Sequence, residues 1–468
     1  MNEVLTSTNI KGVWPQVLAT LVSSSFSICF GSSIAYTAIL IAQLKNEFKP
    51  ITDDEASWIS SIGSPLMVLT SGILILIVDA FGRLNSLRLM IAPFILGQIL
   101  IATSTNLSML LVGKALSIGV SVAFPIISSV YITEISLPSA RGLLLSFKPV
   151  IISFAMLITY IQGKFFNWRI IAYIIGIYAI VVFLLSMLVP ESVLWLSSKH
   201  RKSQAAKSAK WFGVPEVVDV RPNNSKLKLS SFQKPTFYKP IAFITGFYMF
   251  QELSGTNVIF INLITFFDDF GTKYDPFTIS IYLSSAKFFM NMCNSWLMSR
   301  FGRRSLTMFS FLGMAIAITV SATFTMMVNK GGTSYQWVPP VMLIAYVVFL
   351  NCGVMFMPYL ISSELCPGRI RGAAQSISFA ISHVMTFIAL QLYYLLKKHC
   401  TSWYIQYYFG AMALVGVFYS YVFMPETHNK TLTEIEDYFW SHSNYISAQT
   451  VKKNQEKNVL LKTNQFNC

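Results

Sequence analysis

Apolar stretches of about 20 residues recur along the whole chain, separated by short polar connections. About 20 apolar residues is the length that an α-helix needs to cross the hydrocarbon core of a bilayer. Because the backbone finds no water there, it must satisfy its own hydrogen bonds, which favours helices. Only 12% of the residues are charged, compared with roughly 25% in a soluble domain. The sequence therefore predicts an all-α membrane protein.

The apolar stretches fall into two sets of six, which predicts twelve transmembrane helices in two six-helix bundles. The predicted spans lie near 15–44, 56–78, 87–104, 109–134, 142–163 and 168–189, and then near 237–267, 276–298, 305–328, 337–363, 372–396 and 403–424. The corresponding domains are an N-terminal bundle (1–190), a cytoplasmic loop (191–236), a C-terminal bundle (237–424) and a cytoplasmic tail (425–468).

The net charge of +15 is concentrated in a few connections between the apolar stretches. The connection between the two sets is rich in Lys and Arg, from Lys199 to Lys234. Positive residues are retained on the cytoplasmic side of a membrane. Six helices on either side of this loop then place both termini in the cytosol, and we predict a multi-pass protein of the cell membrane. This topology accounts for the basic charge without a nucleic-acid partner; the expected partners are the lipid bilayer and a small-molecule solute, and the oligomeric state is left open.

Three short charged motifs occur twice, once in each half of the chain. They are Asp79-Ala80-Phe81-Gly82-Arg83 and Ser299-Arg300-Phe301-Gly302-Arg303-Arg304 after the second and eighth predicted helices, Glu134 before Arg141-Gly142 and Glu364 before Arg371-Gly372, and Pro190-Glu191-Ser192 and Pro425-Glu426-Thr427 after the sixth and twelfth. Three motifs in register indicate two parallel repeats, as in carriers built from two related bundles.

These charged residues lie at the predicted cytoplasmic ends of the helices. We predict that they form carboxylate–arginine pairs that link the two bundles and hold an inner gate shut; the alternative is that they only anchor the helices. The predicted gate residues are Asp79, Arg83, Glu134, Arg141, Glu191, Arg300, Arg303, Glu364, Arg371 and Glu426.

With these motifs, the chain resembles the sugar porter family of the major facilitator superfamily. The most specific matching pieces are Tyr131-x-x-Glu134, Phe250-Gln251-Glu252-Leu253-Ser254-Gly255-Thr256-Asn257, Trp195-Leu196 and Thr431-Leu432-x-Glu434-Ile435. Ser57-Trp58-Ile59 and the start of the Phe250 motif look most like the insect facilitated trehalose transporter branch. The resemblance implies a central cavity between two bundles and movement of hexoses or disaccharides by alternating access, without a cofactor.

Proton-coupled relatives carry an aspartate in the first helix, where this chain has Phe30-Gly31-Ser32-Ser33. A proton-driven cycle needs a titratable group that is exposed to each side in turn, so this position favours facilitative transport. An enzyme is not expected, since the sequence shows no nucleotide-binding loop and no nucleophile beside a base. Nor do the six cysteines have the spacing of metal ligands.

A sugar requires neutral amide donors and acceptors and an aromatic platform in a mostly apolar cavity. Gln251 and Asn257 match the family's sugar contacts, and Glu252 stands where a second glutamine is usual. The alternative for such residues is hydrogen bonding between helices. The predicted substrate-binding residues are Gln251, Glu252, Asn257, Asn262, Lys287, Asn351, Tyr359, Ser382 and His383, with no metal ligand among them.

Several positions depart from the family pattern. Pro149 stands where relatives have a key glutamine, and Lys287 stands where they have an amide. We expect Lys287 and Glu252 to pair across the cavity, either as a fixed salt bridge or as part of a cavity for a charged solute. Glu252 or His383 could also add a proton step. Three hypotheses therefore stay open, namely a sugar carrier, a sensor that binds sugar without transport, and a carrier of a charged solute.

Overall fold

The computed structural model describes residues 14–46, 50–213, 235–331, 335–365 and 371–426, and over these ranges the chain is helical with no strand. The first group of helices is α1 (Trp14–Lys45), α2 (Asp53–Ser61), α3 (Gly63–Phe81), α4 (Arg83–Ala102), α5 (Leu107–Ser121), α6 (Ala123–Ile135), α7 (Pro138–Phe165) and α8 (Trp168–Ser186). Two short helices follow, α9 (Val193–Ser198) and α10 (Lys202–Phe212). The second group is α11 (Pro235–Leu253), α12 (Thr256–Ile261), α13 (Leu263–Asp268), α14 (Pro276–Arg300), α15 (Arg303–Asn329), α16 (Val338–Cys352), α17 (Met357–Leu365), α18 (Arg371–His399) and α19 (Ser402–Phe423).

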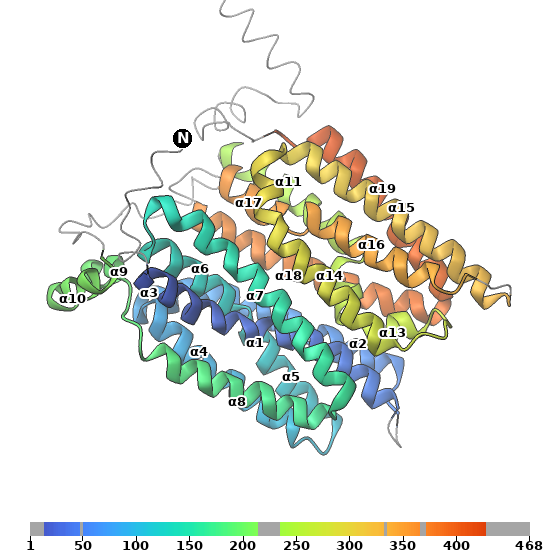
Figure 1. Cartoon of the computed structure of the whole chain (residues 1–468), viewed down its shortest axis with the longest axis horizontal. Helices are drawn as coiled ribbons and strands as arrows, with labels where there is room; N and C mark the ends of the chain where they lie inside the picture. The colour runs from blue at the N-terminus through green and yellow to red at the C-terminus, as the bar shows by residue number, and fades with distance from the viewer. Residues whose placement is uncertain (1–13, 47–49, 214–234, 332–334, 366–370, 427–468) are drawn as a thin grey trace, which may run out of the picture.

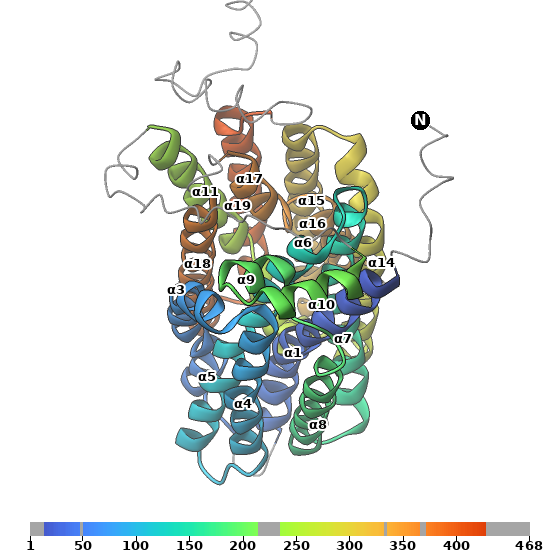
Figure 2. The same cartoon turned by 90° about the vertical axis from the view of Figure 1, so that its left-hand side faces the viewer.

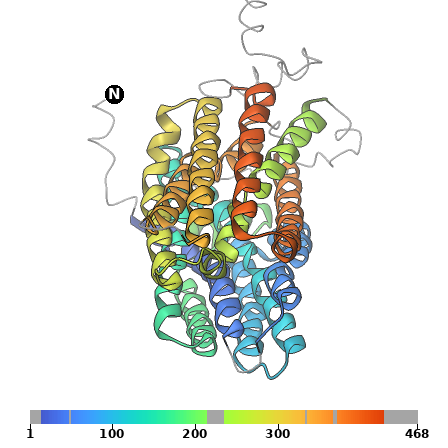
Figure 3. The same ribbon diagram turned by 90° about the vertical axis from the view of Figure 1, so that its right-hand side faces the viewer.

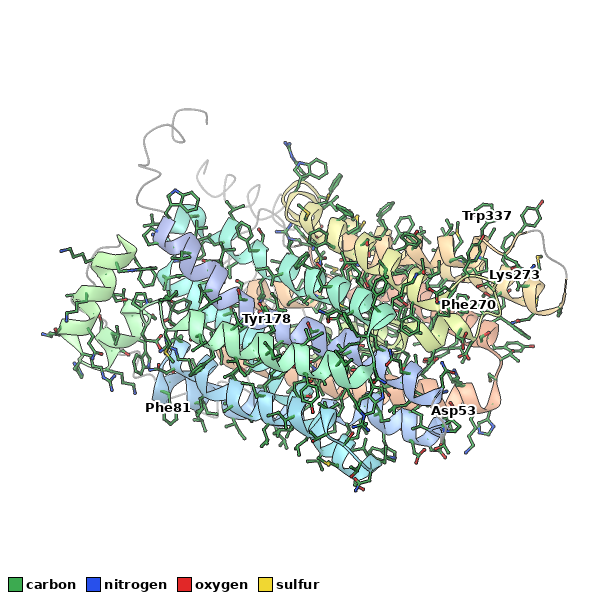
Figure 4. The ribbon with its side chains drawn as sticks, turned by 60° about the horizontal axis from the view of Figure 1, so that its bottom comes forward. Asp53, Phe81, Tyr178, Phe270, Lys273 and Trp337 are labelled. Carbon is green, nitrogen blue, oxygen red and sulfur yellow. The ribbon has the colours of Figure 1, made fainter. Side chains whose placement is uncertain are left out.

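The two groups of helices lie side by side (Figure 1). We call α1–α8 the N-terminal group and α11–α19 the C-terminal group. Helices α9 and α10 lie across one end of the molecule, which faces the viewer in Figure 2. Figure 3 shows the other end, which we call the far end. In Figure 4, Asp53, Phe270 and Lys273 lie toward the far end and Phe81 lies toward α9.

Nine helical segments among the described residues are long and apolar enough to cross a membrane. Two of these nine join consecutive helices, α2 with α3 and α5 with α6. This confirms the predicted all-helical membrane protein. The count of twelve spans stays a prediction, because α11, α14 and the pair α16–α17 are needed to complete it and are not among the nine.

Large apolar side chains point outward along the spans, among them Leu76, Leu184 and Phe418. Inside, small residues allow the helices to approach closely. At the crossing of α4 and α5, a Cβ added to Gly97 would lie 2.8 Å from the carbonyl oxygen of Gly113, and a Cβ on Gly113 would lie 2.9 Å from that of Gly97. This distribution suits a protein in lipid, where association depends on close packing of small residues and not on burial of large apolar ones.

Local capping interactions fix where several helices begin. The Thr52 hydroxyl accepts a hydrogen bond from the Glu55 N–H, and the Glu55 carboxylate accepts one from the Thr52 N–H, which together form a capping box at the start of α2. The side chains of Asn106 and Asp275 also accept hydrogen bonds from backbone N–H groups, at the starts of α5 and α14. Each cap satisfies backbone N–H groups that the first turn of a helix leaves free.

Four predicted spans are interrupted in the structure, and 56–78 and 109–134 each break at one residue, Ile62 and Val122. The spans 237–267 and 337–363 are interrupted more strongly, so a continuous helix there is a wrong expectation. The first breaks at Gly255, whose φ of +93° is a left-handed conformation, and where an added Cβ would lie 2.7 Å from the Phe409 ring. It breaks again at Asn262. The second breaks after Cys352, and α17 begins at Met357. Breaks inside membrane helices expose backbone groups and are typical of carrier binding sites.

The predicted polar loop 191–236 contains two helices that the sequence analysis did not anticipate, α9 and α10. Trp195 and Leu196 of α9 and Ala205 of α10 form a small buried cluster. This cluster fixes the two helices against each other across the end of the molecule. The rest of the loop and the predicted tail from residue 427 lie outside the described residues.

Candidate functional site

The break between α11 and α12 brings two predicted residues together. The Asn257 side-chain amide donates a 2.7 Å hydrogen bond to Oε1 of Glu252. The hydroxyls of Thr256 and Thr386 also lie beside this carboxylate. Gln251 and Glu252 are both buried, whereas Asn257 is partly exposed. The predicted residues of the Phe250 motif therefore form a buried polar group at the broken helix.

Lys287 does not form the salt bridge that the sequence analysis predicted. Its ammonium lies 3.7 Å from the centre of the Phe260 ring, and no carboxylate among the described residues pairs with it. Oε1 of Glu252 is bonded to Asn257, and the Lys287 side chain lies instead on the Phe260 ring of α12. A lysine in mid-membrane costs about 2.5–3.5 kcal/mol on insertion scales, and a cation–π contact returns about 0.5–2 kcal/mol. The ring contact therefore offsets only part of the cost.

A polar stripe runs along one face of α14. It consists of Ser280, Ser284, Lys287, Asn291 and Asn294, each at most 6% exposed. The spacing alternates between four and three residues, which keeps these side chains on one side of a helix. Tyr282, Phe289 and Trp296 lie exposed elsewhere on α14. The sequence analysis singled out only Lys287, although this spacing of polar residues in an otherwise apolar helix would have identified the others.

Buried polar atoms without a hydrogen-bond partner occur in both helix groups of the described structure, for example in Gln98 and Gln406, and six amide, carboxylate or imidazole atoms among them lie on α11, α14, α16 and α18. They are Gln251 Oε1, Glu252 Oε2, Asn291 Oδ1, Asn294 Oδ1, Asn351 Oδ1 and His383 Nε2. Helix α11 packs against α18 and α14 packs against α16, and the contact of Lys287 with Phe260 links α14 to α12 at the broken helix. Buried polar groups are normally hydrogen-bonded, and leaving one unsatisfied costs about 1–3 kcal/mol. Such a group of atoms is suited to a solute that supplies the missing donors and acceptors.

The remaining predicted site residues differ in their surroundings. Asn262 is satisfied at both ends, since its amide donates to the Val258 carbonyl and its Oδ1 accepts a 2.7 Å bond from the Tyr394 hydroxyl. This matches the alternative of bonding between helices. Ser382 is buried and its carbonyl accepts from the Thr386 hydroxyl. Tyr359 belongs to α17, and its side chain lies outside the described residues.

At the α9 end, the predicted gate residues of the N-terminal group contact one another. The Arg83 guanidinium donates to Oε1 of Glu134 at 2.7 and 3.0 Å, and Asp79 lies 3.6 Å from it. Glu191 accepts hydrogen bonds from the backbone N–H groups at the start of α4, including that of Leu84 at 2.9 Å. The expectation that these four residues link the two bundles is therefore not met in this conformation. The free N–H groups of a helix start attract a carboxylate, which accounts for the position of Glu191.

The C-terminal group repeats this arrangement. Glu426 accepts the backbone N–H groups of Arg303 at 2.9 Å and Arg304 at 3.1 Å, at the start of α15. The Arg303 guanidinium donates to the Met298 carbonyl, as that of Arg83 donates to the Val78 carbonyl. The motif pairs found in the sequence are thus equivalent in three dimensions.

The other predicted gate residues do not form described carboxylate pairs. Arg141 is exposed and donates a 3.4 Å hydrogen bond to the Ser136 carbonyl, and Arg300 is exposed at the end of α14. Glu364 lies in α17 and Arg371 begins α18, but their side chains lie outside the described residues. The predicted role of Glu364 and Arg371 in linking the two bundles thus stays a prediction.

The far end is closed by hydrogen bonds between the two groups. Gln391 of α18 donates a 2.8 Å bond to the Ser61 hydroxyl and accepts a 3.0 Å bond from the Ser57 hydroxyl, both in α2. The Tyr160 hydroxyl of α7 also donates to the Phe260 carbonyl of α12 at 2.8 Å. We call Ser57, Ser61 and Gln391 the far-end latch.

An exposed ion pair also joins the two groups at the far end. Lys164 of α7 lies 3.4 Å from the carboxylate of Asp275, which caps α14. Partial burial alone would raise the pKa of Asp275, but hydrogen bonds from Thr278 and Phe277 outweigh it and hold this pKa below its usual value. The carboxylate is therefore ionised at neutral pH and available to Lys164. Because both side chains are substantially exposed, the pair contributes little by itself.

Removing the latch should open the far end. We expect Gln391→Leu to shift the equilibrium toward far-end-open states by about 5- to 150-fold, since two hydrogen bonds of about 0.5–1.5 kcal/mol each are lost. Spin labels on cysteines replacing the exposed Ser108 and Tyr335 would report the separation of the two groups at this end. Gln406→Leu is the control, because Gln406 bonds to Thr325 within the C-terminal group. An unchanged distance distribution in Gln391→Leu would refute the role of the latch.

The fold and site together define a membrane-embedded helical carrier, with two related helix groups, a closed far end and a polar interior. The family model "Sugar (and other) transporter" matches residues 19–439, and the chain belongs to this family.

Relatives of known name agree with this. The chain is 30% identical over 455 residues to the facilitated trehalose transporter Tret1 of Polypedilum vanderplanki, covering 92% of this chain and 89% of that protein. It is also 30% identical to Tret1 of Aedes aegypti over 92% of this chain, and there it spans only 56% of the longer relative. The fold is similar to the inward-open conformation of the xylose transporter XylE from E. coli, with a TM-score of 0.73, 20% identity, and coverage of 90% of this chain and 98% of that one.

Proposed function

We propose that this protein carries a sugar, trehalose or a hexose, across the cell membrane by facilitated alternating access. The observation that supports this most directly is the group of buried, unsatisfied polar atoms on α11, α14, α16 and α18. A sugar offers many hydroxyls, each able to donate and accept, and so can satisfy amide and carboxylate oxygens at several points at once. The named relatives are trehalose transporters, which gives the solute class.

The surroundings of α1 support a facilitative mechanism. Lys114 of α5 reaches into α1 and donates to the Ser33 carbonyl at 3.2 Å and to the Thr37 hydroxyl at 2.6 Å. Helix α1 contains no acidic residue. A carboxylate that takes up a proton on one side and releases it on the other is therefore missing from this helix, which supports movement without proton coupling through α1.

We infer that the α9 end faces the cytosol, together with both termini, and that the far end faces outside. The basic residues of the α9–α10 region, such as Lys199 and Lys202, favour this orientation. Two bundles, 1–190 and 237–424, then rock about the site, with the loop 191–236 and the tail 425–468 in the cytosol. In this conformation the far-end latch is made, which corresponds to a carrier that is closed to the outside.

The charged motifs at the α9 end act in the same cycle. In the present conformation, the Arg83–Glu134 ion pair stabilises the N-terminal group, and the hydrogen bonds of Glu426 stabilise the C-terminal group. We infer that Arg141, Arg300, Glu364 and Arg371 come together between the groups when the α9 end closes. These four residues thus form the gate between two helix groups, each of which is stabilised by its own charged motif.

Solute exchange by the purified protein in vesicles tests the proposed function. Vesicles preloaded with unlabelled trehalose or glucose should take up the labelled sugar by saturable counterflow. Protein that is monodisperse and thermally stable, yet exchanges neither sugar nor any sugar derivative, would contradict the carrier function and favour a sensor.

A further inference from the structure

Lys287 differs from the other buried lysines of the described membrane helices in its partners. Lys114 donates to two oxygen atoms of α1, and Lys148 donates to the Pro125 carbonyl and the Ser129 hydroxyl. Among the described residues, Lys287 has only the Phe260 ring, at 3.7 Å from the ring centre. Its side chain is 5% exposed. Three N–H donors on a full positive charge are thus buried without an acceptor or a counter-ion in this part of the chain.

The position of the ammonium relates it to the polar group at the broken helix. Phe260 and Asn257 lie three residues apart on α12, and residues at this spacing share one face of a helix. Phe260, whose ring contacts the ammonium, therefore lies about one helical turn along α12 from Asn257, which holds Glu252. A solute of sugar size can span both.

The two ends of this site are suited to different chemical groups of a solute. Oε2 of Glu252 is a buried acceptor without a partner, and a carboxylate of this kind accepts hydrogen bonds from hydroxyls. The same carboxylate repels an acidic group placed next to it. At Lys287, by contrast, an anionic group completes a charge-assisted hydrogen bond. The complementary solute is polyhydroxylated and has one acidic group at one end.

We propose that the solute is a sugar acid with a single carboxylate, which binds the Lys287 ammonium while its hydroxyls bind Glu252 and Asn257. This inference rests on the proposed carrier function and specifies its substrate class. The protein supplies the positive charge at the Lys287 end of the site, and the carboxylate of the solute supplies the direct ion-pair partner that Lys287 lacks among the described residues.

A comparison of glucuronate exchange with glucose exchange tests the inference. In vesicles, wild-type protein should exchange labelled D-glucuronate saturably and faster than D-glucose. Lys287→Gln should lower the ratio of glucuronate to glucose flux by about 10- to 150-fold, the contribution of a hydrogen bond between charged groups. Lys287→Arg, which keeps the charge, should retain most of the ratio. Lys330→Gln, at an exposed lysine that ends α15, is the matched control.

The membrane potential gives a second readout that does not depend on any variant. Net uptake of a monoanion by wild-type protein should rise when the inside is made positive, and reversing the potential should change accumulation by about tenfold or more. Saturable glucose uptake with no glucuronate exchange and no response to potential would overturn the inference and leave the carrier function standing. Absence of exchange for both solutes would overturn the carrier function itself.

Discussion

Arg83→Ala should lower the free energy of unfolding by about 1–4 kcal/mol, a loss between that of an exposed ion pair, about 0–1 kcal/mol, and that of breaking a fully buried one, about 3–5 kcal/mol. Arg83 and Glu134 are each 14% exposed and lie 2.7 Å apart. Glu134 also accepts a short hydrogen bond from the Ser192 hydroxyl at the start of α9. Without Arg83, the Glu134 carboxylate is left buried without its cation, and the ends of α4, α6 and α9 lose their common contact. Thermal and chemical unfolding of the purified protein in detergent would measure the loss.

Asp79→Ala is the matched control, because Asp79 is a second carboxylate beside the same guanidinium. It lies 3.6 Å from Arg83 but is 71% exposed. Ion pairs of this kind contribute about 0–1 kcal/mol, so this variant should remain close to the wild type. Equal losses of stability in both variants would show that burial of the Arg83–Glu134 pair is not what stabilises this end.

Asn257→Ala should reduce solute exchange by about 10- to 150-fold, which corresponds to the 1.5–3 kcal/mol of a hydrogen bond to a charged group. The Asn257 amide holds Oε1 of Glu252 at 2.7 Å, and Oε2 already lacks a partner. The substitution removes one contact to the solute and also releases the carboxylate that provides another. Initial rates of counterflow at subsaturating solute, corrected for the amount of reconstituted protein, are the measurement.

Asn329→Ala provides the comparison for this variant. Asn329 is an exposed asparagine at the last residue of α15, far from the broken helix in sequence and on a different element. Its exchange rate should match that of the wild type. If Asn257→Ala exchanged solute at the same rate as Asn329→Ala, the polar group on α11 and α12 would not be the binding site.

The fold class followed from the sequence because the bilayer restricts what a chain can do. Long apolar stretches must be helices in hydrocarbon, and the repeated charged motifs predicted the equivalence that Glu191 and Glu426 show in the structure. The positions at which helices are interrupted were harder to predict from the sequence. Gly255 and Gly353 mark interruptions, but a glycine in a membrane helix serves close packing equally often, as Gly97 does. Only the tertiary contacts decide between the two roles.

The candidate site was predicted from the sequence only in part. The Phe250 motif pointed to Gln251, Glu252 and Asn257, which the structure brings together at the helix break. The pairing of Lys287 with Glu252 was a wrong prediction, because sequence gives the charges but not the distances between them. The same limitation affected the gate, because Arg83 pairs with Glu134 of its own helix group and not with a carboxylate of the other group.

The central claim is that a polar interior between two helix groups binds a sugar-like solute and passes it across the membrane. Counterflow of labelled solute into vesicles that contain the purified protein tests it most directly, with protein-free vesicles and the Asn257→Ala protein alongside. The account predicts saturable uptake in the wild type, at least about tenfold weaker uptake in the variant, and none without protein. Equal uptake in all three kinds of vesicle would contradict it.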